Sequence, residues 1–229
     1  MNIHTPVKIL NKININNLLD KLPSPEEILW NQGDFRNRQI AQDSHSKSRN
    51  IVRRHEWFNR DGIPEMSLTQ ALEEWRSSYD RPYPFDHCTL TATTSLCSVY
   101  EFQITKILDS AIDKCIKEAL KPIETKNGVV TRAMITALPP GSDIPAHRDL
   151  GLTTRFAHRI HVALAGNDGV IYRIGSHHIR MESGVAYDFN NSWKHSVLNT
   201  GSEWRINLII DYLENPNTKN PWLNLGWRP

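Results

Sequence analysis

The second half of the chain breaks into short apolar segments separated by turn residues, and this rhythm restricts the fold more than any other feature. Gly, Pro and Asn residues punctuate the segments, as in Pro139-Pro140-Gly141 and Asn190-Asn191. Eight strands are predicted, at about 130–138, 144–149, 157–165, 169–174, 177–181, 184–189, 194–199 and 204–213. Eight short strands with turns between them are typical of a double-sheet jelly roll. We therefore predict a mainly β protein with flanking helices.

The first half of the chain shows helical periodicity instead. From Ile104 to Leu120, apolar residues recur at intervals of three and four, charged residues fill the other positions, and Pro122 follows. The other elements predicted here are shorter: a helix at 24–30, a strand at 51–58 and a helix at 67–75. We expect these helices to pack on one sheet of the jelly roll.

We predict one domain, 1–229, in three parts. A helical and irregular part at 1–125 covers the sheet, the jelly-roll core spans 126–213, and 214–229 form an extension. A jelly roll of this length fits a single domain, because all-β folds often use ~200–250 residues in one unit.

Composition narrows the functional classes. The 229 residues include 27 basic and 25 acidic side chains, and a net charge of +2 argues against general nucleic-acid binding. No apolar run approaches the ~20 residues of a membrane span, and the Asn-rich N-terminus has no apolar signal core. Three Cys without a CxxC pair fit a reducing, cytoplasmic compartment. The oligomeric state is not indicated.

Three metal-ligating side chains are spaced so that the predicted fold can bring them together. His147 and Asp149 are two residues apart at the end of the second predicted strand, so both point to one side. His195 starts the seventh strand, which can pair with the second in a jelly roll. Two His and one carboxylate on one face form the facial triad of non-haem Fe(II) sites. We predict that these three residues are the metal ligands and the catalytic centre.

A buried arginine is predicted next to this triad. Alternation along the last strand puts Arg205 and Asn207 on one face and Ile206 on the other. A guanidinium on the inner face is costly to desolvate unless it meets an anion. 2-Oxoglutarate would supply one, because its 2-oxo acid end can chelate iron while its far carboxylate meets the arginine. The alternative is an internal carboxylate partner for Arg205, such as Asp188.

A second pair with strand spacing occurs on the third predicted strand. Arg159 and His161 are two residues apart and share a face, so they add two anion-binding groups to the same wall. The alternative is a surface arginine beside a core histidine.

Together these motifs resemble the aspartyl/asparaginyl β-hydroxylase family of Fe(II)/2-oxoglutarate-dependent dioxygenases. The matching motifs are, in order, Thr136-Ala137-Leu138-Pro139-Pro140-Gly141, Pro145-Ala146-His147-Arg148-Asp149, Arg159-Ile160-His161, Tyr187-Asp188-Phe189-Asn190-Asn191-Ser192-Trp193-Lys194-His195 and Arg205. The resemblance implies a cupin-like double-stranded β-helix. It also implies that Thr136, His161 and Arg205 bind 2-oxoglutarate, with Arg159 either there or towards the prime substrate.

The resemblance further implies a reaction and its cofactors. Fe(II), O₂ and 2-oxoglutarate would be required, and an unactivated C–H of an amino acid or peptidyl side chain would be hydroxylated while 2-oxoglutarate yields succinate and CO₂. The best-known animal members hold iron with two His alone, whereas this chain has Asp149. In that respect it is similar to small bacterial and phage members, including free amino-acid hydroxylases.

The prime substrate is predicted only by chemical class. Arg159 and Arg155, with Arg49 and Arg53 near the mouth, exceed the positive charge that one co-substrate needs, which favours a small molecule or peptide bearing a carboxylate. Small members of the family carry a His-containing polar segment, so we expect His45 near the active-site mouth. Surface ion pairs and a solvated loop are the respective alternatives.

Two other functions stay open at this point. One is a metal-dependent cupin-type enzyme that does not use 2-oxoglutarate, which would have no use for Arg205 and Thr136. The other is a non-catalytic jelly-roll binding module, which would not need an intact triad.

Overall fold

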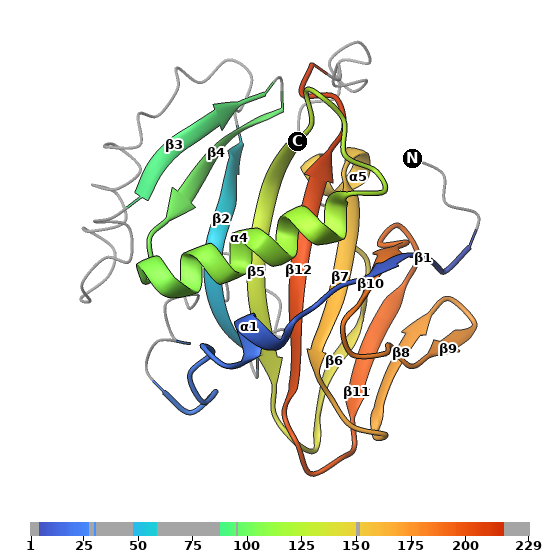
Figure 1. Cartoon of the computed structure of the whole chain (residues 1–229). Helices are drawn as coiled ribbons and strands as arrows, with labels where there is room; N and C mark the ends of the chain where they lie inside the picture. Colours follow the sequence, from blue (N-terminus) through green and yellow to red (C-terminus); the bar gives the residue numbers. More distant parts are fainter. Residues whose placement is uncertain are drawn as a thin grey trace, which may run out of the picture.

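The computed structural model describes residues 5–27, 30, 48–58, 88–94, 96–149 and 152–217, which form two antiparallel β-sheets with helices against the larger one (Figure 1). The large sheet has the strand order β1-β10-β7-β12-β5-β2-β4-β3, and the small sheet has the order β6-β11-β8-β9.

The eight predicted strands are all present in the second half of the chain. They are β5 (Val129–Leu138), β6 (Ser142–His147), β7 (His158–Ala165), β8 (Val170–Ile174), β9 (His177–Ile179), β10 (Val185–Phe189), β11 (His195–Asn199) and β12 (Arg205–Leu213). Strands β10, β7, β12 and β5 are adjacent in the large sheet, and the other four form the small sheet. The chain thus changes sheet at every step except the β8–β9 hairpin. This topology is the predicted double-stranded β-helix, so the fold class is confirmed.

Four further strands widen the large sheet. β2 (Arg49–Phe58) pairs with β5, and β4 (Cys97–Phe102) and β3 (Cys88–Thr93) continue the sheet beyond it. β1 (Val7–Lys12) covers the opposite edge by pairing with β10. The strand predicted at 51–58 is confirmed, whereas β1, β3 and β4 were missed because short segments of about six residues carry little periodicity.

Helix α4 (Lys106–Leu120) lies across the outer face of the large sheet, as Figure 1 shows. The Thr105 side chain caps it by accepting from the backbone N–H of Leu108 at 3.2 Å. Its apolar face packs with the short helix α1 (Asn16–Leu19) and the sheet into the larger hydrophobic core. The helix predicted at 104–120 and its packing are therefore confirmed.

The two shorter predicted helices have different outcomes. Residues 25–27 form a turn in which Glu27 N–H bonds to the Ser24 carbonyl at 2.9 Å, and residues 28 and 29 lie outside the described residues. The helix predicted at 67–75 also lies outside them. A helix that was not predicted, α5 (Leu152–Phe156), precedes β7.

A second apolar cluster lies between the two sheets. It joins Leu138 and Phe189 of the large sheet to residues of the small sheet such as Tyr172 and Val197. We call the side of the large sheet that carries these contacts its inner face. Within the described ranges, no helix has the length and apolar character needed to span a bilayer.

Candidate active site

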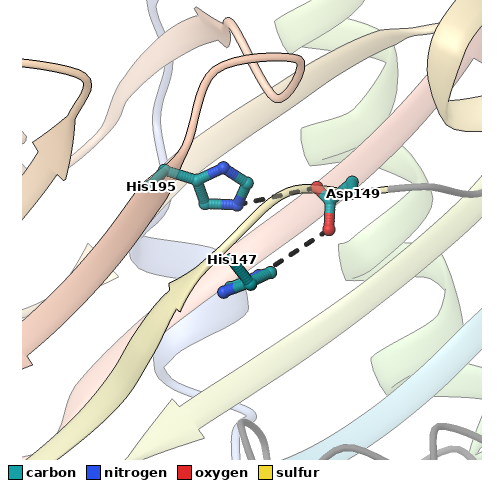
Figure 2. A group of neighbouring side chains, drawn as sticks. All are labelled: His147, Asp149 and His195. Carbon is teal, nitrogen blue, oxygen red and sulfur yellow. Dashed lines mark ion pairs between the residues drawn. The ribbon is translucent and has the colours of Figure 1, made fainter.

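His147, Asp149 and His195 lie together at the ends of two adjacent strands (Figure 2). β6 ends at His147 and β11 begins at His195, and the two histidines are cross-strand partners. Their ring centroids are 4.4 Å apart, and each Nε2 lies 3.7 Å from an oxygen of Asp149. One donor atom of each residue falls within 4.8 Å of the other two. The predicted pairing of the second and seventh strands of the jelly roll thus brings the three side chains together.

Backbone carbonyls select the histidine nitrogens that face the carboxylate. Nδ1 of His147 lies 2.7 Å from the Pro145 oxygen, and Nδ1 of His195 lies 2.9 Å from the Trp193 oxygen. Because a carbonyl only accepts, each Nδ1 carries the hydrogen, and each Nε2 keeps its lone pair when the ring is neutral. Burial lowers the pKa of His195 despite the nearby Asp149 charge, which favours the neutral, ligating form. Hydrogen bonds of this kind orient metal-binding histidines.

Asp149 is ionised and held by Arg159. Burial alone would raise its pKa, but the Arg159 charge and, after it, the two histidines lower the pKa below its usual range. Nη1 of Arg159 donates to Oδ2 of Asp149, while Nε and Nη2 each donate to Asp211 at 2.7 Å. All of these bonds from Arg159 end on carboxylates of the protein. Two internal carboxylates thus pair with Arg159, the residue predicted from the sequence to face 2-oxoglutarate or the prime substrate.

Arg205 opens β12 and is 2% exposed. Its Nη1 donates to the Thr136 hydroxyl at 3.1 Å, and its Nε donates to the Tyr172 hydroxyl at 2.8 Å. Among the described residues no carboxylate pairs with it, because the Asp188 carboxylate accepts from His158 at 2.7 Å instead. Both hydroxyls accept from the guanidinium, so each keeps its own hydrogen for another acceptor. Three donor groups thus meet where the described part of the chain supplies no anion.

Ring contacts connect the triad to this donor cluster. His195 meets Phe189 edge-on with centroids 5.1 Å apart, and Phe189 stacks on His161 at 4.6 Å. His161 in turn meets the edge of Tyr172 at 6.4 Å, and the Arg205 guanidinium lies 5.3 Å from the Tyr172 centroid. Burial and the neighbouring guanidinium groups lower the pKa of His161 well below its usual range, so its ring is neutral. The triad and Arg205 therefore share one site between the sheets.

The remaining predicted site residues lie elsewhere. Arg53 is buried against α4, where it binds two carboxylates, so it is on the outer face and not near the mouth. The Arg49 guanidinium lies 5.4 Å from the Trp204 ring centroid. Arg155 is exposed on α5. His45 lies outside the described residues.

Sequence reasoning left three residues between the sheets without a role, namely Asn207 and Asp211 of the large sheet and Tyr172 of the small sheet. Nδ2 of Asn207 lies 3.5 Å from Nδ1 of His161, and its Oδ1 is buried without a partner among the described residues. The alternation that singled out Arg205 also puts Asn207 and Asp211 on the inner face, so the sequence carried a signal for both. Tyr172 has no such signal, because it belongs to the opposite sheet.

Residues 109–215 match the family model described as Aspartyl/Asparaginyl beta-hydroxylase. This part of the chain is similar to the aspartyl/asparaginyl β-hydroxylase family, and the match covers slightly less than half of the chain. The predicted family is thereby confirmed, and the matched segment contains the whole triad together with Thr136, His161 and Arg205. The match supports a family of the dioxygenase type.

Other comparisons are more distant. An oxidoreductase of the 2OG-Fe(II) oxygenase family from Burkholderia pseudomallei is 9% identical, covers 81% of this chain and 92% of that chain, and has a TM-score of 0.42. A cupin domain from Bordetella pertussis is 14% identical, covers 39% of this chain and 97% of its own, and has a TM-score of 0.29. These scores are too low to carry functional weight. No curated protein sequence matches the chain.

The donor set of the triad fits a divalent transition metal. Two imidazole nitrogens and one carboxylate oxygen, all on one side, are the ligands of non-haem Fe(II) centres with open positions. His147, Asp149 and His195 would hold the ion. The anion-binding groups around Arg205 would then serve a ligand that extends away from it.

Proposed function

We propose that the protein is an Fe(II)- and 2-oxoglutarate-dependent dioxygenase that hydroxylates an unactivated C–H of an amino acid or peptidyl side chain. The observation that carries this proposal is the buried Arg205 guanidinium, which binds two hydroxyls and no described carboxylate in the same site as a His/Asp/His triad. A dicarboxylic acid that chelates the metal at one end and meets Arg205 at the other would satisfy both groups.

The residues around Arg205 suit a carboxylate. A planar guanidinium and two hydroxyl donors, from Thr136 and Tyr172, can all bond to one carboxylate group. The neutral ring of His161, between Phe189 and Tyr172, can donate one hydrogen bond without adding a charge. Site residues from both sheets enclose the co-substrate position, which limits the access of water.

When bound, Fe(II) would supply the oxidative chemistry, in which O₂ gives one oxygen atom to the hydroxylated product and one to succinate as CO₂ leaves. The protein's task is to bind and orient the reactants. Nδ1–H bonds to carbonyls leave the Nε2 atoms of His147 and His195 facing Asp149, where they would hold the metal. No side chain needs to act as a general base.

The substrate class and the location are part of this proposal. Arg53 and Arg159 bind internal carboxylates. We assign a carboxylate on a small-molecule or peptide substrate to the exposed surface at α5, which carries Arg155. Cys97 and Cys115 are both free and buried, in keeping with a reducing, cytoplasmic compartment.

The proposal is tested by 2-oxoglutarate turnover in the presence of added Fe(II) and ascorbate. We expect succinate formation that stops when the metal is chelated. It should be slow without a prime substrate and faster with the correct one. Proteinogenic amino acids and peptides should be screened for a product that gains the mass of one oxygen atom. Stimulation by carboxylate-bearing compounds but not by their amides would support an acidic substrate.

Two alternatives correspond to distinct outcomes of the same assay. A cupin-type metal enzyme that does not use 2-oxoglutarate would bind metal but form no succinate under any condition. A non-catalytic jelly-roll module would give neither metal-dependent turnover nor a modified product.

A further inference from the structure

Five largely buried side chains of alternating charge form a row that ends at the metal site. Glu56 on β2 pairs with Arg132 on β5. Nε of Arg132 lies 3.6 Å from Oδ2 of Asp211 on β12. Arg159 on β7 then bridges Asp211 and Asp149. We call these five residues the charge row.

The middle of the charge row follows the register of the large sheet. Arg132 is the cross-strand partner of Asp211, and Asp211 is the cross-strand partner of Arg159. Opposite charges on adjacent strands attract, and the fork of Arg159 meets both oxygens of Asp211 at 2.7 Å. This bidentate contact fixes the plane of the guanidinium, so that Nη1 is directed at Asp149.

Asp149 requires such an anchor because it lies outside the strands. β6 ends two residues earlier, at His147, so no strand ladder positions the carboxylate. Nη1 of Arg159 donates to Oδ2 of Asp149. The other oxygen, Oδ1, has no bond to Arg159 and lies 3.7 Å from Nε2 of His147. The arginine thereby determines which oxygen is available to a metal ion.

Without Asp149, the charge row has two negative and two positive side chains, so their charges cancel. Glu56 and Asp211, which are 1% and 0% exposed, offset the charges of Arg132 and Arg159. Asp149 therefore keeps its own negative charge for a cation. For the same reason Arg159 brings no unbalanced positive charge to a substrate.

We propose that Arg159, oriented by Asp211, is a positioning residue that presents Asp149 to the metal. This inference rests on the proposed metal-dependent function and assigns Arg159 to the metal ligand, not to 2-oxoglutarate or the prime substrate. The competing explanation is a purely structural ion pair that stabilises the sheet and has no effect on the metal.

The first test is Asp211→Asn, which keeps the shape of the side chain and removes its charge. Without its anchor, Arg159 no longer holds Asp149 in place, and loss of such an outer partner weakens metal binding by roughly 10- to 100-fold. Mn(II) titration of the metal-free protein measures the affinity, and the absorption spectrum of the Co(II) form reports the ligand geometry.

The matched control is Asp113→Asn. Asp113 lies 2.8 Å from the Arg53 guanidinium, so this change also removes a carboxylate from an arginine ion pair, but on the outer face of the sheet. It should lower the stability without changing the Mn(II) affinity or the Co(II) spectrum.

A double variant separates positioning from stability. Replacing Arg159 by Met together with Asp211 by Leu removes the pair and leaves apolar side chains, a change that is often neutral or stabilising for a buried ion pair. Under the proposal, this folded variant loses Mn(II) affinity to a similar degree as Asp211→Asn. If Asp211→Asn does not fold, the Mn(II) affinity of the double variant tests the positioning role in its place.

Unchanged Mn(II) affinity with an unchanged Co(II) spectrum, in either folded variant, overturns the positioning role. If wild-type protein binds no divalent metal at all, the proposed function fails together with the inference. If wild type binds metal and the variants bind it equally well, only the inference fails.

Discussion

Arg159 and Arg205 are both buried on the inner face of the large sheet, and they differ in what they bind. Arg159 is 5% exposed and reaches two carboxylates, Asp211 and Asp149. Arg205 is 2% exposed and reaches two hydroxyls. Burial of a cation is costly without an anion. The first arginine has its anions within the protein, whereas no carboxylate among the described residues pairs with the second.

This difference assigns the two arginines to different partners. Under the proposals above, Arg159 serves the metal ligand, because it connects Asp211 to Asp149. Arg205 is proposed to bind an acid, because its neighbours Thr136 and Tyr172 are also hydrogen-bond donors. Two arginines that look alike in the sequence are thus proposed to have two tasks, one in the metal centre and one in co-substrate recognition.

The largest expected effect is that of Asp149→Ala, which removes the residue that connects the charge row to the metal. We expect coupled hydroxylation to be abolished and metal affinity to fall by more than the ~10- to 100-fold typical of outer partners. Product formation and Mn(II) titration measure the effect. Asp143→Ala, which removes an exposed carboxylate from the preceding strand β6, is the control. Product at the wild-type level from Asp149→Ala would refute the triad.

Arg205→Ala should weaken 2-oxoglutarate binding without changing the affinity for the metal. Loss of one partner of a desolvated charged pair costs roughly 2–5 kcal/mol, so 2-oxoglutarate binding to the metal-loaded protein should weaken by about 30-fold or more. Arg173→Ala, which removes an exposed arginine from β8 of the small sheet, should have no effect. Unchanged 2-oxoglutarate affinity in the Arg205 variant would mean that this arginine serves the structure instead.

Thr136→Val should give a smaller change of the same kind. It removes one hydroxyl that accepts from Arg205 at 3.1 Å, and a single hydrogen bond contributes roughly 0.5–1.5 kcal/mol. We expect 2-oxoglutarate affinity to fall about 3- to 10-fold, measured by calorimetric titration. Thr136→Ser keeps the hydroxyl and should retain most of the affinity. An equal loss in both variants would contradict a role for the hydroxyl.

The outer face offers a charged pair that should affect stability alone. Burial lowers the pKa of His158, but hydrogen bonds and charges from Asp188 and Glu214 outweigh it and raise the pKa above 6.5. Stabilisation by this pair is therefore complete below about pH 6.5 and is lost as pH rises through the folded pKa.

The corresponding variant is His158→Gln. The free energy of unfolding should depend less on pH above about 6.5 than in wild type, while Mn(II) affinity stays the same. Chemical denaturation at several pH values measures the first quantity. A variant with the wild-type pH dependence would show that other groups are responsible for it.

The repeating pattern of short strands was sufficient to predict the jelly roll, because turn residues and alternation are local properties. The same alternation placed His147 with Asp149, and Arg205 with Asn207, and the topology then brought His195 to the triad. Charged partners were harder to predict. Arg159 has two carboxylate neighbours that come from β12 and from beyond β6, and only the strand order of the sheet makes them adjacent.

Contacts between the sheets could not be predicted at all. Tyr172 reaches Arg205 from the small sheet, and this contact depends on how the two sheets stack. Arg53 was misplaced for a different reason. It is two residues from Ile51, which packs in the core with α4, so alternation along β2 puts both side chains on the outer face.

The central claim is that one site binds a metal through the triad and a dicarboxylic acid through Arg205. It is tested most directly by calorimetric titration of the wild-type protein with 2-oxoglutarate, with and without Mn(II), in the absence of substrate. We predict one molecule bound per chain, with markedly higher affinity when Mn(II) is present. Absence of binding to the Mn(II)-loaded protein, or equal affinity with and without the metal, would contradict the account.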